Sequence, residues 1–156
     1  MFSCIVCATD GGEHGDRALA RAIDLAREQQ GDVHAVHVVE RMLGGRLTGQ
    51  TIRLDESEID DKIRRQVSEA REHGVNARLH MVRGSVSEVA DRIAAIADDV
   101  DANLIVTGTR GRSTLTGLVA GSVAHRLIHA SRRPILIVPE FTSSAAEASD
   151  LAGVAA

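Results

Sequence analysis

Residues 104–125 read LIVTGTRGRSTLTGLVAGSVAH, and the order of their features indicates the fold of the whole chain. The stretch begins with a continuously apolar run, residues 104–106, as expected of a strand buried on both faces of a parallel sheet. A glycine-containing loop follows, and after it comes a helical pattern that reaches Ala130. A buried strand, a loop and a helix in this order form a β-α unit, from which parallel sheets are built.

The same alternation of apolar runs and helical patterns extends over most of the chain. Five apolar runs predict strands, and they cover residues 4–8, 33–39, 77–83, 104–106 and 135–138. Four helical patterns lie between consecutive runs, and their apolar faces span residues 19–26, 59–70, 89–97 and 123–130. The pattern predicts a single-domain α/β fold, an open, doubly wound five-stranded parallel sheet with helices on both faces, of the Rossmann-like kind.

Short polar and glycine signals mark the limits of these elements. Ser85 and Glu88 have the spacing of a capping box ahead of the third helix. Gly31 and Gly74 follow the first and second helical patterns, and we expect them to end those helices. We place the domain boundary at residue 139. The Ala/Ser-rich tail, residues 140–156, is predicted to be disordered, with a frayed helix as the alternative.

Composition excludes several kinds of chemistry. Lys62 is the only lysine, and it lies in a charged stretch that we interpret as a solvated helix face, so lysine-based phosphate loops and Schiff bases are excluded. Phe2 and Phe141 are the only aromatic residues, which leaves no stacking platform for single-stranded nucleic acid. The net charge of −4 is spread along the chain, so no partner among nucleic-acid polymers is expected.

No apolar run approaches the roughly 20 residues of a membrane span, and no basic flank precedes the first run. We therefore expect a cytoplasmic protein without a membrane partner. Cys4 and Cys7 form a C-x-x-C, but residues three apart on a strand face opposite sides, which favours a structural role. His125 and His129 lack an evident third ligand, so we interpret them as exposed helix residues and expect no protein metal site.

Ligands of open parallel sheets bind beyond the carboxyl ends of the strands, where the winding reverses. If the first strand is central and the fourth lies beside it, this crevice is bounded by Thr9 and Asp10 on one side. Thr107 and Gly108 then form the other side. Both places are polar and rich in glycine, so we expect the ligand site there.

The glycines after the fourth strand have a spacing that suits a phosphate. Gly108 ends the strand, where the absence of a Cβ lets a ribose or phosphate approach the backbone. Gly111 can adopt a positive φ and turn successive N–H groups toward an anion. Gly121 and Ser122 open a helix, whose unpaired N–H groups and positive dipole end favour phosphate.

At these residues the sequence closely resembles the ATP-binding branch of the universal stress protein family. That branch shows Gly, two residues, Gly, nine residues and then Gly with Ser or Thr, and this chain matches it without a gap. The resemblance covers roughly residues 2–139, so this segment is expected to be a nucleotide-binding domain of that type. The family usually has a serine where this chain has Gly12, which leaves the first helix cap to another group.

The resemblance implies that ATP or AMP binds, with Mg²⁺ or Mn²⁺ bridging the phosphates. Asp10 and Val38 would hold the adenine, and Gly108 would lie by the ribose. The residues it assigns to nucleotide binding are Ala8, Thr9, Asp10, Val38, Gly108, Thr109, Arg110, Gly111, Arg112, Ser113, Gly121, Ser122 and Val123. It also implies a homodimer through the last strand, Ile135–Val138, which would otherwise be an apolar sheet edge.

These observations predict an ATP-binding regulatory protein of the stress response, a nucleotide-dependent homodimeric switch without catalytic residues. Apart from Asp10, assigned to the base end, no residue near the motif resembles a positioned general base. Two alternatives stay open. An ATP-pyrophosphatase-like enzyme has a Ser-Gly-Gly loop similar to Asp10-Gly11-Gly12, although that loop continues differently. An interaction module with a vestigial pocket would keep the fold without binding a nucleotide.

Overall fold

The computed structural model describes residues 1–40, 56–109 and 121–139. The predicted tail, residues 140–156, lies outside these residues, as do residues 41–55 and 110–120. The elements, in chain order, are β1 (Cys4–Ala8), α1 (Glu13–Gln29), β2 (Asp32–Glu40), α2 (Glu56–Glu72), β3 (Asn76–Gly84), α3 (Val89–Asp99), β4 (Leu104–Gly108), α4 (Ser122–Ala130) and β5 (Ile135–Val138). Within the described part, the predicted order of strands and helices is confirmed.

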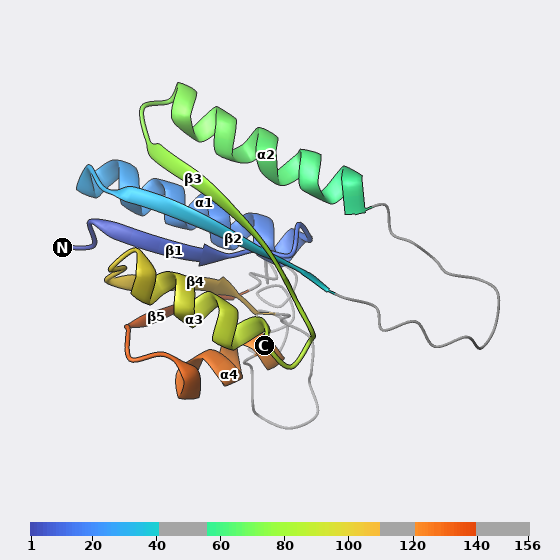
Figure 1. Cartoon of the computed structure of the whole chain (residues 1–156). Helices are drawn as coiled ribbons and strands as arrows, with labels where there is room; N and C mark the ends of the chain where they lie inside the picture. Colours follow the sequence, from blue (N-terminus) through green and yellow to red (C-terminus); the bar gives the residue numbers. More distant parts are fainter. Residues whose placement is uncertain (41–55, 110–120, 140–156) are drawn as a thin grey trace, which may run out of the picture.

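The five strands form one sheet in the order β3-β2-β1-β4-β5, and every neighbouring pair is parallel. β1 is therefore central, with β2 on one side and β4 on the other (Figure 1). The chain winds outward from β1 to β3 and then crosses back to β4, so the direction of winding reverses between β1 and β4. This is the arrangement that the predicted crevice requires.

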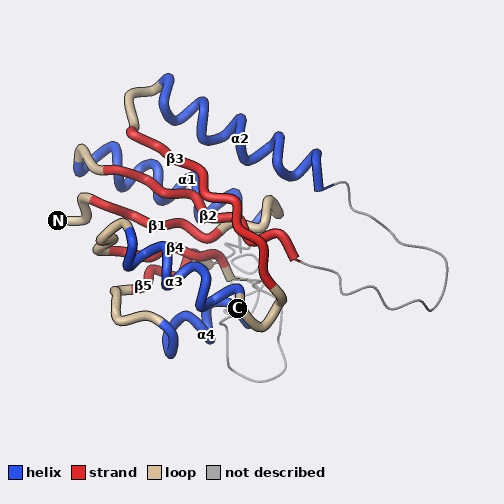
Figure 2. The backbone as a smooth tube through the Cα atoms, in the orientation of Figure 1, coloured by secondary structure: helices blue, strands red, loops and turns tan. Residues whose placement is uncertain are grey.

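Helices cover both faces of the sheet (Figure 2). α1 and α2 pack on one face around fully buried Leu19 and Ile63, while α3 and α4 pack on the other around Ile93 and Leu127. Successive residues of β1 point to opposite faces, and Ile5, Val6 and Cys7 are fully buried, as the continuous apolar run predicts. None of the helices described is long and apolar enough to span a bilayer.

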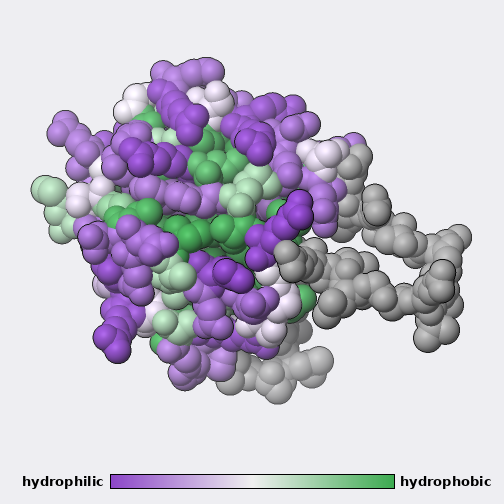
Figure 3. Space-filling view, viewed as in Figure 1, coloured by the Kyte–Doolittle hydropathy of each residue, from purple (hydrophilic) through white to green (hydrophobic). Residues whose placement is uncertain are grey.

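Hydrophilic and hydrophobic residues occupy different parts of the surface. Figure 3 shows hydrophilic residues over much of α2, whereas hydrophobic residues gather in the middle of this face, over the strands between α2 and α3. The buried face of α2 consists of Ile63, Val67 and Ala70, which repeat every three or four residues. Its amphipathic pattern therefore sets which side of the helix meets the sheet.

The three predicted helix limits have different outcomes. Gly74 follows α2 with a φ of +82°, as expected. The Ser85 N–H donates to the Glu88 carboxylate (2.8 Å), which is one half of a capping box, but the N-cap residue of α3 is Glu88 and no described side chain caps it. The residue that ends α1 is Gln30, which has a left-handed φ of 53°. Gly31 is needed for another reason, because a Cβ there would lie 2.8 Å from the Ser3 carbonyl oxygen.

The cysteines have the structural role that their strand position predicts. Cys7 packs in the cluster under α1, while Cys4 packs against the cluster under α3, and both are free thiols. Burial raises the pKa of the Cys7 thiol well above its usual range. A thiol that stays protonated is a poor nucleophile and metal ligand, which agrees with a structural role for Cys7.

Two strand histidines form a pair that the sequence pattern did not reveal. His34 of β2 is 4% exposed, and its Nδ1 lies 2.8 Å from Nε2 of His80 on β3. Burial, the His80 ring and Arg78 lower the pKa of His34, against an opposing effect of Asp32. Burial and Arg78 likewise lower the pKa of His80. Both rings are therefore held neutral in the fold.

This pair predicts that acid destabilises the protein. The unfolded chain takes up protons near the usual histidine pKa of about 6.5, whereas the folded rings resist protonation until lower pH. The pair's contribution is therefore fully present above about pH 6.5 and is lost as the pH falls through the folded pKa values. We expect urea unfolding to give a smaller free energy at pH 5.5 than at pH 7.5. A His80→Gln variant with an unchanged difference between the two pH values would contradict this explanation.

Candidate functional site

A cavity of about 340 Å³ lies at the carboxyl ends of β1 and β4, within the usual size range of small-molecule sites. It is bounded by the turn after β1, the end of β4, part of β2, and residues of α3 and α4. Its lining residues are Ala8, Thr9, Asp10, His14, Gly15, Val36, Val38, Val86, Val89, Ile93, Thr107, Gly108, Gly121, Ser122, Val123 and Ala124. The structure thus has a cavity where the reversal of winding predicts one.

One side of the cavity is aliphatic. Val36 and Val38 are two residues apart on β2 and so share a face, while Val89 and Ile93 are four residues apart on α3. Because no Phe, Tyr or Trp is among the described lining residues, a planar ligand group on this side would lie between aliphatic side chains. This agrees with the near-absence of aromatic residues from the chain.

The turn between β1 and α1 supplies the polar end of the cavity. The Thr9 hydroxyl accepts a hydrogen bond from the Gly11 N–H (3.2 Å), and Asp10 Oδ1 accepts one from the Gly12 N–H (2.9 Å). The Thr9 backbone is also held, because its N–H donates to the Val36 carbonyl (3.0 Å). Gly12 is the N-cap residue of α1, and no side-chain cap from the described residues replaces the serine that the family usually has there.

Gly108 also has a packing role that its predicted role beside the ligand did not include. A Cβ at Gly108 would lie 2.4 Å from the backbone oxygen of His14, in the first turn of α1. The direction that a Cβ would take at Gly108 is therefore filled by α1, while Gly108 itself still lines the cavity. The next residue, Thr109, is 1% exposed and donates its N–H to the Val138 carbonyl (3.1 Å), which extends the pairing of β4 with β5.

The start of α4 faces the cavity from the opposite side. Gly121 is its N-cap residue, with φ −57° and ψ 160°, and no side chain caps this end. The first helical hydrogen bond runs from the His125 N–H to the Gly121 carbonyl (2.9 Å), so the N–H groups of residues 122–124 have no partner within the helix. Such N–H groups, together with the positive end of the helix dipole, favour an anionic ligand group.

The structure brings most of the predicted binding residues together. Eight of them line the cavity, namely Ala8, Thr9, Asp10, Val38, Gly108, Gly121, Ser122 and Val123. Thr109 is adjacent to Gly108 but is not among the lining residues, and Arg110, Gly111, Arg112 and Ser113 lie outside the described residues. Their roles in binding a nucleotide stay predictions.

Sequence reasoning missed several lining residues. Val36 could have been predicted, because it is two residues before Val38 on the same strand and so faces the same side of the sheet. Val86 and Ile93 could not have been predicted from the sequence pattern, since only the position of α3 over the sheet brings them to the cavity. His14 was also missed, and its buried Nδ1 has no hydrogen-bond partner among the residues described.

The described side chains do not form a metal site of their own. No group of three or more His, Cys, Asp or Glu side chains among residues 1–40, 56–109 and 121–139 could hold a metal ion. His125 and His129 lie with their ring centroids 5.2 Å apart on α4 and contact each other edge to face.

An open parallel sheet with a cavity at the reversal of winding defines a Rossmann-like α/β fold. The model of the universal stress protein family matches residues 1–139. Universal stress protein YxiE of Bacillus subtilis is 34% identical over 152 residues, a match that covers 88% of this chain and 99% of that relative. The chain belongs to the universal stress protein family.

Solved structures agree in fold. A universal stress protein from Archaeoglobus fulgidus has a TM-score of 0.67 at 30% identity, over 88% of this chain and 98% of that chain. The structure of the universal stress protein from Archaeoglobus fulgidus in complex with dAMP has a TM-score of 0.60 at 27% identity, over 88% and 97% of the two chains.

Proposed function

We propose that this protein binds ATP or AMP in the cavity between β1 and β4 and acts as a nucleotide-dependent regulatory protein of the stress response. The observation that carries the proposal is the cavity itself, which joins an aliphatic slot to a polar turn and the N-terminus of α4. These three surfaces suit a base, its polar edge and a phosphate respectively. A relative from Archaeoglobus fulgidus forms a complex with dAMP, which supports the same ligand class here.

In this proposal the adenine lies against Val36 and Val38, near Asp10. The phosphates accept hydrogen bonds from the first N–H groups of α4 and from the Ser122 hydroxyl. Mg²⁺ or Mn²⁺ bridges the phosphates and offsets their charge, as is usual for cations bound mainly through a nucleotide.

The metal part of the proposal is tested by chelation. We expect calorimetric titration with ATP to give a weaker affinity when a chelator is in excess, because the phosphate charges are then less well compensated. AMP carries fewer charges and serves as the matched ligand, with a smaller change expected. An ATP affinity that is the same with and without the chelator removes the cation from the proposal.

The proposed protein acts by binding and not by turnover. Asp10 and His14 are the titratable side chains among the described lining residues, and one Asp10 oxygen is engaged by the Gly12 N–H. Mass spectrometry of the nucleotide released from the purified protein identifies the ligand as ATP, AMP or a cyclic nucleotide. Phosphate release from ATP at a rate near the enzyme median of about 10 per second would refute the non-enzyme assignment.

The proposed switch is a homodimer that forms through β5. This strand is at one end of the described sheet, and its four residues are all apolar and only half-buried in the single chain. An unprotected apolar edge of this kind favours pairing with a second copy. We expect light scattering to give the mass of a dimer for the wild-type protein and of a monomer for Ile137→Arg. A monomeric wild-type protein at micromolar concentrations, or a dimeric variant, would contradict this.

A further inference from the structure

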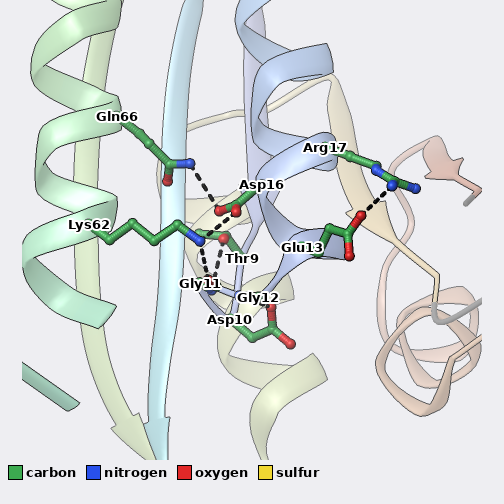
Figure 4. Close-up of polar contacts among 9 residues, drawn as sticks. All are labelled: Thr9, Asp10, Gly11, Gly12, Glu13, Asp16, Arg17, Lys62 and Gln66. Carbon is green, nitrogen blue, oxygen red and sulfur yellow. Dashed lines mark hydrogen bonds and ion pairs between the residues drawn. The ribbon is translucent and has the colours of Figure 1, made fainter. Parts of the chain in front are cut away.

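The only lysine of the chain contacts the turn that carries Asp10. Lys62 lies on α2, and its Nζ donates to the Gly11 carbonyl (2.8 Å) and pairs with Asp16 Oδ2 (2.5 Å). Gln66, one turn further along α2, donates to the other oxygen of Asp16 (2.9 Å). Figure 4 shows Lys62 reaching from α2 across to the turn and the start of α1. The Lys62 side chain is 40% exposed, as expected for a solvated helix face, but its charged end is held by the turn and by α1.

Lys62 and Asp10 hold the two ends of one peptide group. The Gly11 carbonyl accepts from Lys62, and the N–H of the same peptide group, that of Gly12, donates to Asp10 Oδ1 (2.9 Å). The peptide is trans, so these two groups point in opposite directions. A positive charge at the carbonyl end and a negative charge at the N–H end both stabilise this orientation of the peptide dipole.

The orientation of this peptide depends on those contacts. Gly11 has a φ of +73°, and neither Gly11 nor Gly12 has a Cβ that would restrict rotation of the peptide group between them. Ile59 of α2 packs against Gly11, since a Cβ there would lie 2.5 Å from Ile59 Cγ2. Apolar and charged contacts from α2 thus converge on a segment that is intrinsically free to move.

We propose that Lys62 is a positioning residue for nucleotide binding, which fixes the Asp10 carboxylate at the cavity through the Gly11–Gly12 peptide group. This rests on the proposed function, in which Asp10 meets the base of the nucleotide. Lys62 itself is not among the residues that line the cavity. Its effect on the ligand therefore passes through the turn, and α2 becomes a support of the binding site.

A double-mutant cycle between Lys62 and Asp10 tests this coupling. We expect Lys62→Met to weaken AMP binding about tenfold in the wild-type background, as for one lost hydrogen bond to a charged group. In an Asp10→Ala background the same change should alter the affinity by no more than about twofold, because the side chain that Lys62 orients is gone. Lys62→Arg keeps the charge and should recover most of the affinity. Arg65→Met, an exposed change on the same helix, is the matched control.

Melting temperatures separate positioning from a general loss of stability, since the coupling to Asp10 does not follow from destabilisation alone. Should Lys62→Met fail to fold, Asp16→Asn removes the charge that holds Lys62 and takes its place in the cycle. An equal loss of AMP affinity in both backgrounds, or no loss in either, would overturn the inference. A wild-type protein that binds no AMP would instead refute the proposed function, so the two failures are distinguishable.

Discussion

Gly121→Val is expected to bind ATP at least roughly 100-fold more weakly than the wild-type protein, a loss of about 2.8 kcal/mol. Gly121 is the N-cap residue of α4 and lines the cavity, so a branched side chain there would fill the space that the phosphates need. Several hydrogen bonds to charged oxygens, each contributing about 1.5 to 3 kcal/mol, would be lost together. Calorimetric titration with ATP measures the change.

The backbone conformation of Gly121 indicates that Gly121→Val keeps the stability of the wild-type protein. Its φ of −57° is accessible to any residue, so the glycine is not required by a left-handed conformation. The melting temperature without ligand should therefore stay near that of the wild-type protein. Ser122→Ala is the milder comparison and should lose roughly tenfold in affinity, in line with one hydrogen bond. A Gly121→Val protein with normal ATP affinity would show that this loop is not the phosphate site.

Gly108→Ala is expected to lower the free energy of unfolding by about 1 to 3 kcal/mol, the usual cost of overpacking a well-packed site. The added methyl group would lie 2.4 Å from the backbone oxygen of His14, and backbone cannot move aside as a flexible side chain can. Urea unfolding without nucleotide measures this loss, because it arises from the contact between β4 and α1.

Gly74→Ala provides a contrast to Gly108→Ala. No heavy atom of the described residues lies within 4 Å of the Cβ position at Gly74, but its φ is +82°, so this change introduces backbone strain of about 1 to 3 kcal/mol without a steric clash. Its cost should be relieved in Gly74→Asn, since Asn tolerates this conformation better than Ala. A Gly108→Ala protein with wild-type stability and weakened ATP binding would show that contact with the ligand, and not packing against α1, requires a glycine at this position.

Periodicity accounts for most of the fold that could be predicted from the sequence. The continuous run Cys4–Ala8 implied burial on both faces, and a strand of this kind belongs in the interior of a parallel sheet. The spacing of Ile63, Val67 and Ala70 was sufficient to predict the buried face of their helix. These features depend on residues close together in the chain, which a sequence displays directly.

Contacts between distant segments account for what was missed. Lys62 and Gly11 are 51 residues apart, and a lysine among charged neighbours gives no sign of a carbonyl partner so distant in the chain. The pair of His34 and His80 is separated by 46 residues and depends on the register between β2 and β3. Nothing in the sequence indicated that Gly108 is needed for packing, because the approach of α1 to the end of β4 joins segments far apart in the chain.

Binding of an adenine nucleotide in the cavity between β1 and β4 is tested most directly by calorimetric titration of the wild-type protein with ATP in the presence of Mg²⁺. We predict saturable binding of one nucleotide per chain, which AMP displaces and the pyrimidine nucleotide CTP does not. The absence of saturable binding up to about 1 mM ATP, equivalent to less than about 4 kcal/mol of binding free energy, would contradict this prediction.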